Sequence, residues 1–300
     1  MSQNRLVRAL VATATAGVMV GIAAGEASAA TPSRSKGVKN AVYFVHGLDG
    51  KHLEVGNAKQ DCKAVWGKAM SDLRAKGWKG KFVTWGYYKK NVNCTRKVNG
   101  NLDTRIQELG RLLAWDIYKN YSRHGKKVDV VGHSMGGQVI RAAITGVNKY
   151  GSSSKWPDYL YVEDVVTLGS PFKGAGIART CAAQGHKQCS DLKPGSNFLS
   201  WAGQNPQSRM KTDWTLIGSS DDDAVHSGSA IGMKAKHKVV YYVNQGLEHS
   251  SIKSAGGNKK YKYKWTDDYG SHWISNTDRP TNQRAPLRYA YEALKDPSIW

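Results

Sequence analysis

The chain has few cysteines, few acidic residues and no long apolar run beyond its first thirty residues. None of the four cysteines stands in a Cys-x-x-Cys pair, which argues against a redox motif or a zinc site of that type. A membrane-spanning helix needs about 20 consecutive apolar residues, so no such helix is expected after the N-terminal segment. The 23 acidic residues stand against 44 lysines and arginines, giving a formal net charge of +21.

The N-terminal segment, residues 1–29, has the pattern of a secretory signal peptide. Arg5 and Arg8 precede an apolar run at 9–24, and the segment ends in Ala27-Ser28-Ala29. This run is too short to span a bilayer, and its small-residue end suits a signal peptidase. We expect cleavage after Ala29 and a soluble protein secreted to the extracellular space.

The excess of positive charge favours encounters with anionic surfaces. The lysines are scattered along the chain, however, and form no compact basic helix, zinc motif or RNA-binding signature. We therefore expect no specific binding of nucleic acid. A solvated, soluble surface is an equally good interpretation of the positive charge. The sequence does not predict the oligomeric state.

An even number of cysteines in an exported chain predicts disulfide bonds. Of the three possible connectivities, we favour Cys62–Cys94 and Cys181–Cys189, because each pair then closes a single excursion of the chain. On the chain-entropy model these loops contribute about 3.7 and about 2.6 kcal/mol.

Apolar periodicity predicts strands alternating with helices. The expected strands are at 41–45, 82–85, from 128, 162–168, 214–217 and 239–243, and the expected helices at 58–76, 102–121, 139–147 and 285–294. This alternation is typical of an α/β fold with a mainly parallel sheet covered by helices on both faces.

The length of residues 30–300 suits a single α/β domain. Residues 171–213 interrupt the alternation, and we interpret them as a cap or substrate-facing excursion, with an ordinary long loop as the alternative. Residues 251–300 form a basic, aromatic-rich C-terminal part.

A Gly-x-Ser-x-Gly motif places Ser134 between the strand that begins at Val128 and a helical pattern. At such a turn the serine hydroxyl stands above the sheet, and Gly132 and Gly136 avoid side-chain collisions. Ser134 is therefore a candidate nucleophile. A glycine-rich turn that only packs a helix on a sheet is the alternative.

A serine needs a base and an acid to become a nucleophile, and in hydrolases with this turn they follow in the order serine, acid, histidine. Three carboxylates, Asp221, Asp222 and Asp223, follow the strand at 214–217, and Asp222 fits best because Val225 can anchor the loop. Such an acidic turn could instead be solvated or hold a cation, but three adjacent carboxylates suit calcium poorly. His249 follows the next strand and is the favoured base, with His272 as its rival.

Acyl transfer also needs backbone donors for a developing oxyanion. We assign the amides of Leu48, in the loop after the first strand, and of Met135, directly after the serine. His46 is expected to brace the first loop, and His133 to pack.

Together, Phe44-Val45-His46-Gly47-Leu48, Gly132 to Gly137, Thr167 to Pro171, Ser219 to Val225 and Gly246 to His249 resemble a secreted bacterial lipase or esterase of the α/β-hydrolase fold, of the small serine lipase type. The resemblance covers residues 41 to about 250. It implies ester hydrolysis by Ser134, His249 and Asp222 without metal or organic cofactor. Ser170 and Phe172 depart from the residues common in such relatives, which leaves substrate preference open.

The leading hypothesis is therefore a hydrolase of lipid acyl esters, acting where the substrate can lie at an anionic interface. A phospholipase, a polyester or cutin-like esterase and an acyltransferase would use the same residues. From a different class, the chain could be a catalytically inactive hydrolase fold that binds polyanions.

Overall fold

The computed structural model describes residues 30–52, 56–277 and 283–296; the predicted signal peptide, residues 1–29, lies outside this range. The strands within it are β1 Ala41–Val45, β2 Phe82–Gly86, β3 Arg96–Lys97, β4 Val128–His133, β5 Val162–Leu168, β6 Asp213–Ser219, β7 His237–Tyr241, β8 Tyr263–Thr266 and β9 Ile274–Ser275. The helices are α1 Cys62–Ala75, α2 Ile106–Asn120, the 3₁₀ turn η1 Ser122–His124, α3 Met135–Tyr150, α4 Ala178–Ala183, α5 Lys187–Leu192, α6 Asn197–Trp201, α7 Ser227–Ala230 and α8 Pro286–Lys295.

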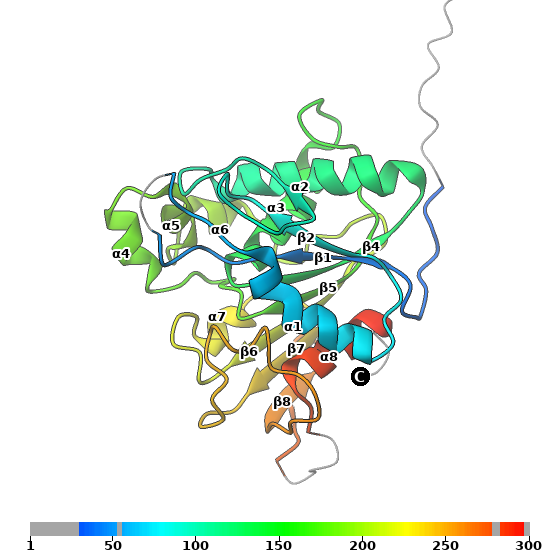
Figure 1. Cartoon of the computed structure of the whole chain (residues 1–300), viewed down its shortest axis with the longest axis vertical. Helices are drawn as coiled ribbons and strands as arrows, with labels where there is room; N and C mark the ends of the chain where they lie inside the picture. The colour runs from blue at the N-terminus through cyan, green and yellow to red at the C-terminus, as the bar shows by residue number, and fades with distance from the viewer. Residues whose placement is uncertain (1–29, 53–55, 278–282, 297–300) are drawn as a thin grey trace, which may run out of the picture.

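The strands form one sheet in the order β3-β2-β1-β4-β5-β6-β7-β8-β9. All pairs from β3 to β7 are parallel, and β8 and β9 add an antiparallel edge. Helices α2 and α3 cover one face, and α1 and α8 cover the other (Figure 1). The predicted mainly parallel sheet with helices on both faces is confirmed.

Alternation along β1 explains the two layers. Tyr43 and Val45 belong to the apolar core under α2 and α3, whereas Val42 and Phe44 belong to the core under α1 and α8. Successive strand side chains point to opposite faces, so a strand covered on both sides reads as a continuous apolar run. That is why this short segment was recognisable as a buried strand.

The helix boundaries follow from their capping residues. Asp61 accepts hydrogen bonds from the amides of Lys63 and Ala64, so α1 begins at Cys62 and not at residue 58 as predicted. Pro286 occupies the first position of α8, where its missing amide hydrogen costs nothing. None of the helices in the described ranges is long and apolar enough to cross a membrane.

Some elements differ from the sequence predictions. The strand predicted at 239–243 is shifted to His237–Tyr241, and the helix predicted at 102–121 begins at Ile106. Strands β3, β8 and β9 were not predicted; Lys264 interrupts the apolar pattern of β8, which pairs with β7. The interval 171–213 contains three short helices, α4 to α6.

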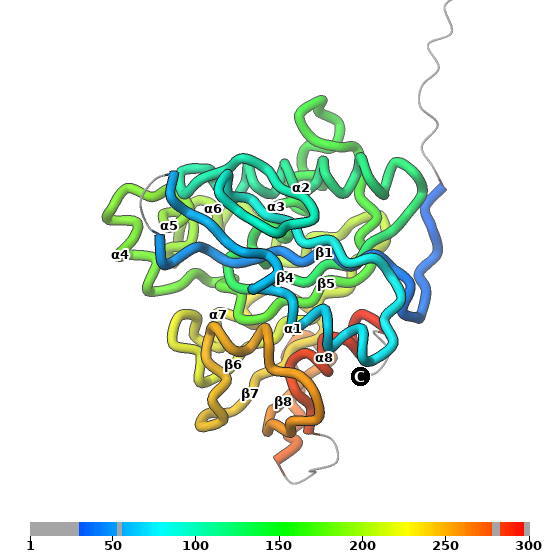
Figure 2. Tube along the Cα trace, in the orientation of Figure 1, coloured from blue at the N-terminus to red at the C-terminus, as the bar shows by residue number. Residues whose placement is uncertain are grey.

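The segment before β1 contacts the amino end of β5 and lies beside the end of α8 (Figure 2). The amide of Gly37 donates to the carbonyl of Lys295 at 2.8 Å, and Lys36 pairs with Asp296. The two ends of the described chain are therefore held together at the edge of the molecule opposite the carboxyl ends of the parallel strands.

Candidate active site

Ser134 lies at the junction of β4 and α3 in a strained backbone conformation. Its φ is 54° and its ψ is −130°, a region that non-glycine residues rarely occupy. A side chain at Gly136 would lie 2.1 Å from the carbonyl oxygen of Val45, and one at Gly47 would lie 2.7 Å from the serine Cβ. The small residues therefore let neighbouring backbone approach the turn closely, as the motif predicts.

Because β4, β5, β6 and β7 are consecutive parallel strands of one sheet, the loops after β4, β6 and β7 meet at one edge. His249 Nε2 lies 2.8 Å from Ser134 Oγ, and His249 Nδ1 lies 2.9 Å from Asp222 Oδ2. A carboxylate can only accept, so Nδ1 carries the hydrogen and Nε2 is free to accept from the serine hydroxyl. The structure thus brings the three predicted residues into one hydrogen-bonded line.

Asp222 is held in place by its own loop. Its Oδ1 accepts hydrogen bonds from the amides of Ala224 and Val225, at 3.0 and 2.7 Å, and Val225 is buried in the core. The side chain of Asp222 is fully buried, while that of His249 is 19% exposed. The carboxylate is therefore fixed in one orientation, and the imidazole still faces the cavity.

The two acidic neighbours support the histidine loop through its backbone, which the sequence did not predict. Asp221 accepts from the amides of Asn244 and Gln245, both at 2.7 Å, and Asp223 accepts from the amide of His249 at 3.4 Å. These backbone amides hold the pKa of Asp221 below its usual value despite its partial desolvation. The three carboxylates therefore have different partners and do not converge on one point.

Two other histidines that follow Asp222 in the chain, the rival base His272 and His237, lie elsewhere. His237 begins β7 and pairs with Asp213, at the amino ends of the strands. His272 lies between β8 and β9, where its amide donates to Asp268. Neither residue lines the cavity described below.

His133 packs beside His249, with ring centroids 4.8 Å apart. Its Nε2 donates to the carbonyl oxygen of His249 at 2.8 Å. Burial, together with the positive potential of neighbouring groups including Lys253, lowers the pKa of His133 well below its usual value. A neutral His133 therefore braces the backbone of His249, in agreement with its predicted packing role.

His46 braces the loop after β1, as predicted. Its Nδ1 donates to the carbonyl oxygen of Gly47 at 2.8 Å, and its Nε2 accepts from Asn91 Nδ2 at 2.7 Å. The ring stacks on Tyr87, whose hydroxyl donates to the carbonyl oxygens of His46 and Gly47. Burial lowers the pKa of His46 to about 4, so the ring is neutral near pH 7.

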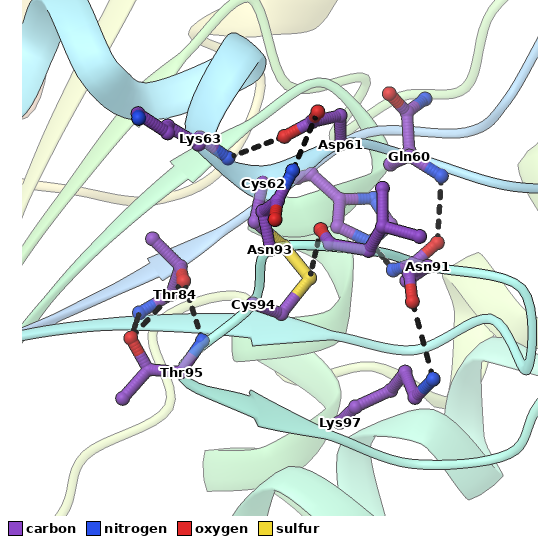
Figure 3. The surroundings of a disulfide bond; sticks show 12 residues. Gln60, Asp61, Cys62, Lys63, Thr84, Asn91, Asn93, Cys94, Thr95 and Lys97 are labelled. Carbon is purple, nitrogen blue, oxygen red and sulfur yellow. Dashed lines mark hydrogen bonds between the residues drawn. A yellow bond between two sulfur atoms is a disulfide. The ribbon is translucent and has the colours of Figure 1, made fainter.

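Both predicted disulfides, Cys62–Cys94 and Cys181–Cys189, are present. The first joins the start of α1 to the loop that carries Asn91 (Figure 3). In that loop the Asn91 side chain accepts from the amide of Gln60 at 2.7 Å while it donates to His46. Hydrogen bonds thus connect this disulfide loop to the loop that contains Leu48.

A cavity of about 610 Å³ opens beside Ser134 and His249. Leu48 lines it, and the amide of Met135 is at the first turn of α3, where backbone donors have no intrahelical partner. No residue of 171–213 is among the described residues that line this cavity. The interpretation of that interval as a substrate-facing cap stays a prediction.

One cluster of buried carboxylates within the described ranges has a spacing that could suit a metal ion: Asp129, Glu163 and Asp164. It lies toward the amino ends of β4 and β5, away from Ser134. Arg34 pairs with Asp164 at 2.5 Å and Lys127 pairs with Glu163 at 2.7 Å. Two basic side chains therefore already compensate the negative charge of the cluster. Burial raises the pKa of Asp164 to about 8 and that of Asp129 well above its usual value. This cluster was not predicted from the sequence because its members lie within apolar strands.

The strand order, the Ser134 turn and the helices on both faces define the α/β-hydrolase fold. Residues 36–184 match the model of a family described as the PGAP1-like alpha/beta domain. The comparison with curated proteins found no match.

The solved structures to which the chain is similar include the following three. The propeptide form of the Bacillus licheniformis lipase BlEst2 is 21% identical, with a TM-score of 0.48; the match covers 74% of this chain and 49% of that one, so the chain spans about half its length. Est1E from Butyrivibrio proteoclasticus, with ferulic acid bound, is 14% identical, with a TM-score of 0.45 and coverage of 87% and 88%. A lipase-esterase related protein from Clostridium acetobutylicum is 12% identical, with a TM-score of 0.44 and coverage of 71% and 88%.

Proposed function

We propose that residues 30–300 form a secreted serine hydrolase that cleaves carboxylic esters, with lipid acyl esters as the substrate class. The observation that carries the proposal is the hydrogen-bonded line from Ser134 through His249 to Asp222 at the wall of a cavity. The predicted signal peptide at 1–29 and the two disulfides support an extracellular location.

In the proposed reaction, Ser134 Oγ attacks the ester carbonyl carbon while His249 Nε2 takes the hydroxyl proton. Asp222 keeps the imidazole in the required tautomer and stabilises the imidazolium that forms. The amides of Leu48 and Met135 donate to the carbonyl oxygen as it gains negative charge.

The tetrahedral intermediate then collapses, the bond to the alcohol oxygen breaks, and His249 returns the proton to the leaving alcohol. The acyl group stays on Ser134. A water molecule attacks this acyl-enzyme with His249 again as the base, which releases the carboxylic acid and restores the serine. No step requires a metal ion or an organic cofactor.

Hydrolysis of p-nitrophenyl butyrate by the mature chain tests this proposal. His249→Ala should lower kcat/KM by at least about a thousandfold, whereas the matched change His272→Ala should stay within about threefold of wild type. Absence of ester hydrolysis by the folded wild type would favour the alternative of an inactive polyanion-binding protein. Near-full activity of His249→Ala would remove the assigned base.

The alternative activities use the same residues and differ in substrate. A panel of triacylglycerol emulsion, phospholipid vesicles, a polyester film and a non-water acyl acceptor separates lipase, phospholipase, polyesterase and acyltransferase. The wild type and Ser134→Ala are assayed side by side, so that activity unrelated to the proposed nucleophile is subtracted.

A further inference from the structure

The cavity beside Ser134 has an uneven distribution of charge. Lys51, Lys59 and Lys253 line it, together with the carboxylates of Asp49 and Asp61. Three lysines therefore line the space that the substrate of the proposed function would occupy.

Both carboxylates already have partners of their own. Asp49 accepts from the amides of Lys51 and Lys59 and from His52 Nδ1, at 2.8 to 3.1 Å. Asp61 caps α1 and also accepts from Asn93. The carboxylate oxygens of Asp49 and Asp61 thus accept hydrogen bonds from the segments that form the cavity wall.

The three lysines differ from the two carboxylates in their interaction partners. Within residues 30–52, 56–277 and 283–296, no carboxylate lies at ion-pair distance from the ammonium group of Lys51, Lys59 or Lys253. Lys253 is also partly buried, and its Nζ donates to the backbone carbonyl of Ser250. Burial lowers the pKa of Lys253, which reflects the cost of removing its charge from water without an anion beside it.

Lys253 lies close to the proposed catalytic residues. It is four residues after His249, and its positive charge contributes to the lowered pKa of the buried His133 beside that residue. An ammonium group at this place can hydrogen-bond to an anionic oxygen of a bound substrate, and such charge-assisted bonds are among the strongest in proteins.

The remaining wall of the cavity offers an apolar surface. Leu48, Val65 and Val92 line it, and Val92 is 53% exposed. An acyl chain could cover this surface, with a negatively charged group nearer to Lys253.

We propose that the cavity binds acyl esters that carry an anionic phosphate group, with Lys253 as the principal phosphate-binding residue and Lys51 and Lys59 at the mouth. This inference rests on the proposed function and narrows it to anionic esters, glycerophospholipids above all, in preference to neutral glycerides.

The test compares two substrates that differ in charge: phosphatidylglycerol and diacylglycerol with the same acyl chains, each in mixed micelles with a neutral detergent. Lys253→Gln should lower kcat/KM for phosphatidylglycerol at least about tenfold more than it lowers kcat/KM for diacylglycerol. Lys260→Gln removes the same charge from an exposed position outside the cavity and should leave both values near wild type.

A second measurement on the wild type does not depend on the variants. Glycerol 3-phosphate and inorganic phosphate should both inhibit hydrolysis of p-nitrophenyl butyrate competitively, whereas glycerol should not. Stronger inhibition by glycerol 3-phosphate identifies the phosphate as part of a lipid headgroup; equal inhibition identifies a site for free phosphate.

Two results would overturn the inference: an equal loss for both lipids in Lys253→Gln, or no change for either. The absence of inhibition by both phosphates in the wild type would also overturn it. In each case continued hydrolysis of p-nitrophenyl butyrate leaves the proposed function intact, whereas failure on every ester would contradict that function itself.

Discussion

Replacing Cys62 and Cys94 with serine removes the bond between α1 and a loop that lines the cavity. That loop carries Asn91, whose side-chain amide donates to His46 at 2.7 Å. Since His46 braces the loop that contains Leu48, the change should loosen a proposed oxyanion donor as well as the fold.

The expected loss of stability follows from the length of the closed loop. A sequence separation of 32 residues corresponds to about 3.7 kcal/mol on the chain-entropy model. For a domain of this size that is a decrease in Tm of roughly 7 to 15 °C. The Cys181–Cys189 bond, with a separation of 8 residues, corresponds to about 2.6 kcal/mol and a smaller decrease.

The two disulfides differ in the effect that their removal should have on activity. Complete loss of one oxyanion donor costs about 10² to 10³ in kcat, so a displaced donor should cost about tenfold. Cys62→Ser/Cys94→Ser should therefore lose kcat on p-nitrophenyl butyrate, while Cys181→Ser/Cys189→Ser should retain it.

Both variants are assayed far below their Tm, and circular dichroism follows their thermal unfolding. Equal kcat for both double variants and the wild type would refute the coupling between the first disulfide and the site. A loss of kcat that is equally large in both would also refute it.

Three further perturbations test separate contacts. The pKa of His46 is lowered to about 4, so between pH 6.5 and 4 the unfolded chain binds a proton there that the folded chain does not. The free energy of unfolding of the wild type relative to His46→Gln, measured by urea titration, should therefore fall by about 3 kcal/mol as the pH is lowered over that range. A difference that stays constant with pH would show that burial does not lower the pKa of His46. Asp222→Asn should lower kcat by up to about 10⁴-fold and Asp221→Asn by less than about tenfold, because only the former contacts the imidazole; the reverse order in steady-state assays would move the acid by one residue. Gly47→Ala should lower kcat with the fold retained, because the added Cβ would lie 2.7 Å from the Cβ of Ser134. An unchanged kcat would show that the backbone of the turn can shift to accommodate the methyl group.

The sequence predicted those parts of the site that depend on local pattern and strand order. Ser134 was recognisable because strand, glycine-rich turn and helix are contiguous in the chain. Asp222 and His249 followed because parallel strands bring their carboxyl-terminal loops to one edge of the sheet. Val225 pointed to Asp222 among the three aspartates, and its amide does donate to that carboxylate.

The contacts that were not predicted join residues far apart in the chain. Asn91 meets His46 across 45 residues, and only the folded loop places its amide beside that ring. The carboxylates of Asp129 and Asp164 occur in strands that look apolar in sequence, and Arg34, 130 residues away, compensates one of them. Such pairings have no periodic signal, because burial and charge compensation are decided by the tertiary fold.

Covalent labelling tests whether Ser134 is the nucleophile. A fluorophosphonate probe should modify the folded wild type once, at Ser134 as located by peptide mass spectrometry, with loss of esterase activity in proportion to labelling. Ser134→Ala should take up no probe, should lose at least about a thousandfold in kcat/KM and should unfold at a Tm close to that of the wild type. Labelling at another residue, or an active Ser134→Ala protein, would show that Ser134 is not the nucleophile.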